Sequence, residues 1–327
     1  MYKHKVLITP FIESINNEEA FNLLREAGCE LKVHYFDGHQ LTEGEIGRLI
    51  EDMDGVIAAG EPYTKAVLDR AKRLKIISRL GVGYDKIDIQ VATEKGVMIT
   101  VTRGASNEAV AELAFALILC LARCITECDR NIKQNKWLLR PGLCMNNKVL
   151  GIIGLGAIGK DLIKKAKGFN MKIIAYDTEP DKKFARAESV TLATLNDVLS
   201  QADFVSLHLP LNEKTRYLIG DKELKLMKPT AYLVNTSRGA IVREEALVKA
   251  LKGKWIAGAG LDVFEHEPPW DSELLSLDNV ILTPHIGGST EEALRLMGKL
   301  AAENVVRVFK GEVPDQLVNP EVKGIRP

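Results

Sequence analysis

Three glycines in the middle of the chain have the spacing of a dinucleotide site. Gly154, Gly156 and Gly159 stand in a G-x-G-x-x-G pattern, after the apolar run Val149–Ile153 and before a helical pattern at Lys160–Phe169. The first glycine permits a tight turn, the second lets a pyrophosphate approach the backbone, and the third lets helix and strand pack closely. The start of the helix adds N–H donors and the positive end of a dipole. We therefore predict a dinucleotide site, the alternative being a glycine-rich turn without a ligand.

An acidic residue after the next strand indicates which dinucleotide is bound. Asp177 directly follows the apolar run Lys172–Tyr176, and the three residues after it are Thr, Glu and Pro, with no arginine among them. A carboxylate here can accept hydrogen bonds from both ribose hydroxyls of an adenosine, and it repels a 2′-phosphate. The sequence therefore predicts NAD rather than NADP.

The second half of the chain offers an arginine, a glutamate and a histidine, each after a strand-like run: Arg238, Glu267 and His285. Hydride transfer between a nicotinamide and an alcohol or ketone needs an acid–base group, and histidine titrates near pH ~6.5 without perturbation. A carboxylate beside it favours the imidazolium and orients the ring, and an arginine offers a planar fork for a substrate carboxylate. Each residue alone has an ordinary alternative: a strand-end histidine, a solvated acid, a surface ion pair. Together in one crevice they would form a catalytic set, and we expect this role for them.

These residues need parallel sheets to bring them together. Candidate strands in the first hundred residues are Lys5–Thr9, Leu31–Phe36, Gly55–Ala59, Lys75–Arg79 and Val97–Thr100, and candidate helices are Asn17–Glu26, Glu43–Asp52, Lys65–Arg70 and Ile87–Glu94. Later strands are expected at Phe204–Leu209, Ala231–Asn235, Ile256–Ala259 and Val280–Thr283, after a long helix over Glu108–Lys136 and before a final helix over Glu291–Lys310. Alternating strands and helices predict parallel α/β sheets, with ligands at the carboxyl ends of the strands.

The expected fold is thus α/β with two domains, a Rossmann-type doubly wound parallel sheet and a discontinuous flavodoxin-like substrate domain. We expect residues 1–101 to begin the substrate-binding domain, residues 102–287 to form the NAD-binding Rossmann domain, and residues 288–327 to return to the substrate domain as a C-terminal helix.

Composition narrows the class of protein. The 327 residues include 44 Lys and Arg and 44 Asp and Glu, so the formal net charge is zero. No basic run marks a surface for nucleic acid or an anionic membrane, and no apolar stretch is long enough for a membrane span. The first residues lack the pattern of a signal peptide. A cytoplasmic enzyme with a small-molecule substrate is expected, with no nucleic-acid or membrane partner.

Five cysteines, an odd number, argue against a complete disulfide framework. Cys120, Cys124 and Cys128 have a spacing that would place them on one helical face. This spacing matches no zinc pattern and no histidine is near, whereas free cysteine packs well as a small buried hydrophobe. We expect packing rather than a metal site.

The fingerprint and the three polar segments resemble the NAD-dependent D-2-hydroxyacid dehydrogenase family across the whole chain. The resemblance implies that Arg238 binds the substrate carboxylate and carbonyl, that His285 is the acid–base group and that Glu267 is its partner. Besides the glycines, it implies cofactor contacts by Ala157, Ile158, Asp177, His208, Leu209, Pro210, Thr236, Ser237, Asp262 and Gly288.

The resemblance also implies a substrate loop and an assembly. The loop contains Arg79, Gly81, Val82 and Gly83, and its backbone N–H groups would form a nest for the substrate carboxylate. A homodimer is implied through the nucleotide domain, including the segment from Arg123 to Leu143.

Substrate identity rests on finer resemblances. Asn107–Glu112 and His285–Ala293 are similar to the D-3-phosphoglycerate dehydrogenase branch, and Arg79 matches a phosphate-side arginine of that branch. Ala59 stands where the branch often has a second arginine, and Gly83–Asp88 is more similar to hydroxypyruvate or glyoxylate reductases. We expect oxidoreduction of a small D-2-hydroxy or 2-keto acid, with 3-phosphoglycerate slightly ahead of hydroxypyruvate or glyoxylate. An NADH-sensing protein like the C-terminal binding corepressors is the rival from another class.

Overall fold

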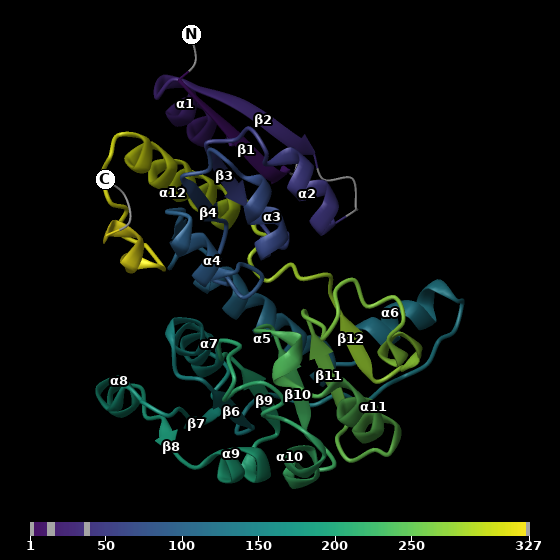
Figure 1. Ribbon diagram of the computed structural model, residues 1–327. Coiled ribbons are helices and arrows are strands. Elements are labelled where there is room, and N and C mark those ends of the chain that lie inside the picture. Colours follow the sequence, from purple (N-terminus) through teal and green to yellow (C-terminus); the bar gives the residue numbers. More distant parts are fainter. Residues whose placement is uncertain (1–2, 12–16, 36–39, 325–327) are drawn as a thin grey trace. The chain divides into compact units, whose positions relative to one another are not determined.

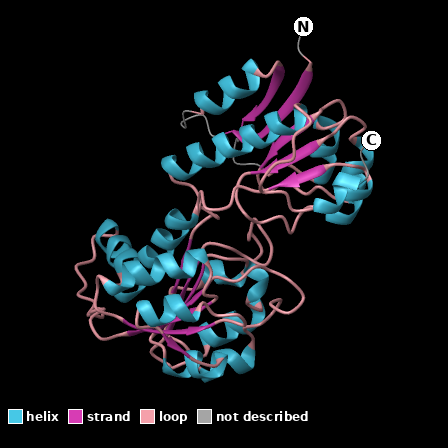
Figure 2. Ribbon diagram, turned by 90° about the vertical axis from the view of Figure 1, so that its left-hand side faces the viewer, coloured by secondary structure: helices cyan, strands magenta, loops and turns pink. Residues whose placement is uncertain are grey.

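The computed structural model describes residues 3–11, 17–35 and 40–324. The chain divides into two compact units, unit 1 with Met1–Ser106 and Ser289–Pro327, and unit 2 with Asn107–Gly288. Figures 1 and 2 show that each unit is a sheet covered by helices. Unit 1 extends to Ser106 and not only to residue 101, because the Thr102 N–H donates to the Gly81 carbonyl at 2.9 Å and the Val101 N–H to the Gln316 carbonyl at 3.3 Å.

The sheet of unit 1 has five parallel strands in the order β2-β1-β3-β4-β5. The strands are β1 (His4–Phe11), β2 (Cys29–Tyr35), β3 (Gly55–Ala58), β4 (Ile76–Arg79) and β5 (Met98–Thr100). This is the strand order of flavodoxin-like sheets, so the predicted architecture is confirmed.

Helices cover both faces of this sheet. The helices are α1 (Glu18–Glu26), α2 (Glu43–Leu49), α3 (Lys65–Arg70), α4 (Ile89–Glu94) and α12 (Glu291–Phe309), followed by the 3-10 helix η3 (Pro320–Gly324). On one face Leu24 of α1 and Val305 of α12 pack over Ile76, and on the other Ile46 of α2 and Leu68 of α3 join a second core. Because α12 packs against α1, the C-terminal helix belongs to unit 1.

The sheet of unit 2 has seven parallel strands in the order β12-β11-β10-β9-β6-β7-β8. The strands are β6 (Val149–Ile153), β7 (Lys172–Tyr176), β8 (Thr191–Leu192), β9 (Phe204–Leu207), β10 (Tyr232–Asn235), β11 (Gly258–Leu261) and β12 (Val280–Leu282). The order reverses between β6 and β9, as in Rossmann sheets, and ligands bind at the carboxyl ends beside such a switch point. The predicted Rossmann-type fold is confirmed.

The helices of unit 2 also lie on both faces. They are α5 (Asn107–Ala122), α6 (Ile125–Lys133), α7 (Ala157–Lys167), α8 (Lys182–Ala187), α9 (Leu195–Gln201), α10 (Asp221–Leu226) and α11 (Glu244–Lys252), with 3-10 helices η1 (Gly239–Ile241) and η2 (Glu273–Ser276). One core joins α5 and α7 through residues such as Ile118 and Leu162, and the other joins α9, α10 and α11 through Leu199, Leu224 and Leu247. Burial on both faces holds the strand ends in place.

The single helix expected over Glu108–Lys136 is wrong. α5 ends at Ala122 and α6 begins at Ile125, and Cys124 between them has a left-handed φ of 52°. The Leu143 N–H donates to the Ala122 carbonyl at 2.7 Å, so the chain returning after α6 takes an acceptor that a continuing helix would have used.

The three cysteines therefore do not share one helical face, because Cys120 belongs to α5 and Cys128 to α6, with a bend of 63° between the helices. All five cysteines are free, and within the described ranges no group of three or more His, Cys, Asp or Glu side chains is arranged to hold a metal ion.

No single helix in the described part of the chain has the length and hydropathy for a membrane span, and only the bent pair of α5 and α6 meets those criteria together.

Candidate active site

The fingerprint glycines lie between β6 and α7, and each has a different neighbourhood. Gly154 has a φ of 102°, and a Cβ there would lie 2.3 Å from the His208 carbonyl oxygen. A Cβ at Gly159 would lie 2.4 Å from the Gly154 carbonyl oxygen, whereas one at Gly156 would meet nothing within 4 Å. Two glycines are thus required by the fold itself. The third, at the N-cap of α7, leaves open space of the kind that a pyrophosphate needs.

Asp177 braces this glycine turn from the end of β7. Its Oδ2 accepts from the Leu155 N–H at 2.7 Å, and its Oδ1 accepts from the Glu179 N–H at 2.8 Å. An ionised carboxylate has about four acceptor positions, so both oxygens keep capacity for ribose hydroxyls. Ala157 and Ile158 open α7, where the first N–H groups of a helix have no partner within it.

Two buried polar atoms beside the turn have no protein partner among the described residues. They are Nδ1 of His208, after β9, and Oγ1 of Thr236, after β10. The Nε2 of His208 pairs with the Ser206 hydroxyl at 2.9 Å, and desolvation lowers the pKa of His208 to about 4, so the ring is neutral near pH 7. Unpaired buried polar atoms at strand ends are places where a ligand or water completes the hydrogen bonding. Together with the open Gly156, they fit a bound dinucleotide.

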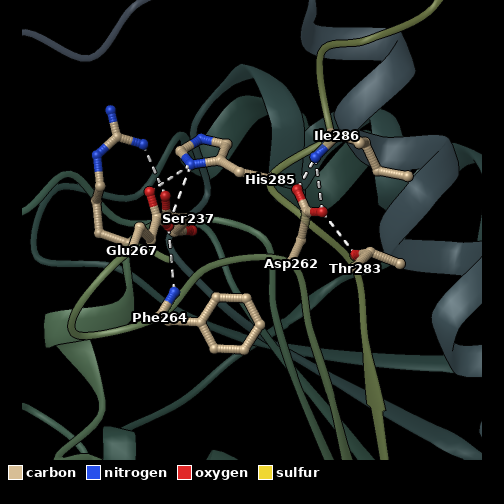
Figure 3. Close-up of polar contacts among 9 residues, drawn as sticks. Ser237, Asp262, Phe264, Glu267, Thr283, His285 and Ile286 are labelled. Atoms are coloured by element: carbon tan, nitrogen blue, oxygen red, sulfur yellow. Dashed lines mark hydrogen bonds and ion pairs between the residues drawn. The ribbon is translucent and has the colours of Figure 1, made fainter. Parts of the chain in front are cut away.

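Two residues predicted to bind the cofactor have side chains that hold the fold. The Ser237 hydroxyl donates to the Leu207 carbonyl and so links the ends of β10 and β9. Asp262 is 1 % exposed, and its carboxylate accepts from the Thr283 hydroxyl at 2.6 Å and from the N–H groups of Ile286 and Gly287, each at 2.8 Å. Burial raises the pKa of Asp262, and these three hydrogen bonds oppose that rise. Asp262 therefore shapes the loop that carries His285 (Figure 3).

His285 and Glu267 form a direct pair (Figure 3). His285 has a φ of 54°, and its Nδ1 lies 3.0 Å from Oε2 and 3.1 Å from Oε1 of Glu267. The Phe264 N–H donates to Glu267 Oε1 at 3.2 Å, which fixes the carboxylate. The glutamate side chain is 15 % exposed and that of the histidine 46 %. The acid of the pair is thus more shielded from solvent than the histidine, whose Nδ1 is occupied by the carboxylate, as expected of a general acid–base group.

Arg238 follows β10, and Glu267 lies after β11, the neighbouring strand. His285 lies after β12, which pairs with β11. The Nη1 of Arg238 donates to the Ser237 carbonyl at 2.7 Å, and the Arg238 carbonyl accepts from the Asn235 side-chain amide at 2.9 Å. The three predicted catalytic residues therefore follow adjacent strands of one sheet.

Gly239 is a site residue that the sequence reasoning missed. A Cβ there would lie 1.9 Å from the Phe264 carbonyl carbon, so the Arg238 turn packs directly on the loop that carries Glu267. The sequence feature that could have indicated this close contact is the glycine directly after Arg238, in the turn that follows the strand.

The loop predicted to bind substrate lies after β4 in unit 1. The Arg79 Nη1 donates to the Leu80 carbonyl at 3.0 Å and to the Ala58 carbonyl at 3.4 Å. The Gly81 N–H donates to the Thr102 hydroxyl at 2.8 Å, so it is already used within unit 1. Within the described residues the N–H groups of Val82 and Gly83 have no acceptor, which leaves two adjacent donors of the predicted nest.

Comparison with known proteins identifies the family. Residues 115–287 match the family model of the D-isomer specific 2-hydroxyacid dehydrogenase, NAD binding domain. A glyoxylate reductase of Pyrococcus furiosus is 40 % identical, with 99 % of this chain and 98 % of that protein covered. A D-3-phosphoglycerate dehydrogenase of Methanocaldococcus jannaschii is 42 % identical over 96 % of this chain, which spans 59 % of that longer protein.

Solved structures agree with this match. A Thermus thermophilus protein has a TM-score of 0.87 at 36 % identity, with 96 % of this chain and 99 % of that chain covered. The D-lactate dehydrogenase of Aquifex aeolicus, complexed with NAD and lactic acid, has a TM-score of 0.83 at 28 % identity, with the same coverage. The fold, the strand-end residues and these matches lead to one conclusion: the chain belongs to the D-isomer specific 2-hydroxyacid dehydrogenases, NAD-dependent oxidoreductases acting on CH–OH groups.

Proposed function

We propose that this enzyme reduces a small, unphosphorylated 2-oxo acid with NADH, with glyoxylate and hydroxypyruvate as the first candidates. The catalytic part rests on the 3.0 Å pair of His285 and Glu267 and on Arg238, which follows a strand of the same sheet. The substrate class rests on Arg79, whose Nη1 is used by the carbonyls of its own unit, and on Ala59, which offers a phosphate no second cation. Relatives that match nearly the whole chain and are named glyoxylate reductase support the same choice.

Each residue has a defined part in the reaction. When bound at the glycine turn from Gly154 to Gly159, NADH would supply the hydride to the carbonyl carbon. His285 as imidazolium donates its Nε2 proton to the carbonyl oxygen, and it takes a proton back when the 2-hydroxy acid is oxidised. Glu267 orients the ring through Nδ1, and the Arg238 fork holds the substrate carboxylate. A 2-oxo acid, NADH and a proton thus give a 2-hydroxy acid and NAD.

A substrate panel tests the choice of acid. NADH oxidation is measured with glyoxylate, hydroxypyruvate and 3-phosphohydroxypyruvate, for the wild type, for Arg79→Ala and for the exposed control Arg48→Ala in α2. We expect kcat/KM to be highest for an unphosphorylated acid, and we expect Arg79→Ala to lower it equally for hydroxypyruvate and its phosphate. A loss confined to the phosphorylated acid would restore 3-phosphoglycerate as the substrate. Tight NADH binding without turnover on any acid would favour the corepressor-like rival.

We also propose that the enzyme is a homodimer formed through unit 2. The segment after α6 exposes large apolar side chains, with Trp137 84 % and Leu139 86 % exposed, and Ile132 at the end of α6 is 54 % exposed. Contiguous exposed apolar residues mark interaction surfaces. Sedimentation should show a dimer for the wild type and a monomer for Trp137→Glu, whereas a monomeric wild type would refute this assembly.

Five free cysteines are in keeping with a reducing cytoplasm, where we place the enzyme.

A further inference from the structure

A second glutamate holds the loop that carries Glu267. Glu265 lies two positions earlier, and its carboxylate has two partners other than His285. Oε1 accepts from the Tyr217 hydroxyl, and Oε2 accepts from the Glu244 N–H at 3.2 Å. Glu244 is the first residue of α11, where an N–H has no partner within the helix. One carboxylate therefore joins the loop to a helix N-terminus and to a tyrosine.

Both partners are themselves fixed. The Tyr217 N–H donates to the Ala240 carbonyl at 2.8 Å, and the Arg243 guanidinium lies 5.1 Å from the centroid of the Tyr217 ring. The Ser272 hydroxyl donates to Glu244 Oε1 at 2.5 Å. Each partner of Glu265 thus makes a further contact with another part of unit 2.

The same short loop makes the contacts that the chemistry needs. The loop runs from Phe264 to Glu267. The Phe264 N–H donates to the Glu267 carboxylate, which in turn pairs with His285 Nδ1. The Phe264 carbonyl lies against Gly239, directly after Arg238. A shift of this loop would therefore move the partner of the acid–base group and the support of the arginine turn together.

We propose that Glu265 is a positioning residue for the reaction, acting through Glu267: its bonds to Tyr217 and Glu244 hold the loop where Glu267 meets His285. This inference rests on the proposed function. Misplacing a catalytic group by about 1 Å can cost about 10²-fold in rate.

A double-mutant cycle separates positioning from simple capping of α11. kcat, KM and the Kd for NADH are measured for Glu265→Ala, Glu267→Gln and the double variant. We expect Glu265→Ala to lower kcat by about 10- to 100-fold with NADH affinity kept within about twofold. In the Glu267→Gln background the further loss should fall below about threefold, because residues that act as a unit are not additive.

Two further variants control for stability. Thr194→Ala removes the side-chain cap of α9, where the Thr194 hydroxyl accepts from the Asp197 N–H, at a comparable cost of about 1 kcal/mol but away from the loop. It should leave kcat unchanged. Tyr217→Phe removes one bond of Glu265 and keeps the ring, so it should show the same pattern with a smaller loss if Glu265→Ala does not fold.

An equal loss in both backgrounds, or wild-type kcat in Glu265→Ala and Tyr217→Phe, would overturn the positioning role. Failure of the proposed function has a different signature, since the wild type itself would then show no turnover on glyoxylate or hydroxypyruvate.

Discussion

His285 is held at Nδ1 by the partly buried carboxylate of Glu267 and through its backbone by the Asp262 carbonyl, which accepts its N–H at 2.9 Å. A ring fixed at one nitrogen can transfer protons only through the other, so its removal should affect chemistry more than binding. We expect His285→Ala to lower kcat by about 10²–10⁴-fold with the Kd for NADH nearly unchanged. His266→Ala, at an exposed histidine nearby, is the control and should keep full turnover. Near-wild-type turnover of His285→Ala would remove this residue from the mechanism.

Asp177 braces the Leu155 N–H with one carboxylate oxygen, and we propose that the same side chain also binds the ribose hydroxyls of NAD. We expect the wild type to have a much higher kcat/KM for NADH than for NADPH, and Asp177→Ala to narrow that ratio mainly through loss of NADH affinity. Asp181→Asn is the control, since this exposed acid pairs with Lys160 and caps α8. Equal constants for both cofactors in the wild type would contradict our interpretation of Asp177.

At the scale of elements, two glycines predict opposite outcomes for the same substitution. Gly239→Ala would place a methyl group 1.9 Å from the Phe264 carbonyl carbon, so the Arg238 turn and the Glu267 loop must separate. We expect a loss of about 1–3 kcal/mol in the free energy of unfolding and a fall in kcat. Gly156→Ala meets no atom within 4 Å, so it should fold normally but bind NADH more weakly.

Thermal unfolding and NADH titration of the two variants check this contrast. If Gly239→Ala had the thermal stability and turnover of the wild type, the close contact between the Arg238 turn and the Glu267 loop would contribute to neither.

At the scale of the whole molecule, His208 makes stability depend on pH. Desolvation lowers the pKa of His208 from 6.5 to about 4. Between these two pH values the histidine is protonated in the unfolded chain but neutral in the folded chain. Because the unfolded state binds more protons there, the free energy of unfolding falls as pH decreases from 6.5 toward 4. Urea midpoints at pH ~7.5 and ~5 should therefore differ less for His208→Gln than for the wild type or for the exposed control His266→Gln. Identical pH dependence in all three would show that His208 does not contribute.

The sequence by itself determined the architecture and the chemistry. β6, the glycines and α7 could be predicted because strand periodicity, glycine spacing and a helix start are encoded within a few neighbouring residues. Arg238, Glu267 and His285 could be placed together because the carboxyl ends of parallel strands share one edge, and the structure puts their strands next to one another.

Only the tertiary structure decided how backbone and side-chain groups pair across the chain. The Leu143 N–H takes the Ala122 carbonyl at the end of α5, and the Asp262 carboxylate accepts from N–H groups of the loop that carries His285. Gly239 packs directly against the Phe264 carbonyl. Each of these contacts joins segments that are distant in sequence. The sequence shows which residues carry an acceptor or lack a Cβ, but no pattern in it identifies the group that each one contacts. The side chains could be named from the sequence, but the contacts that hold them in place follow from three-dimensional packing.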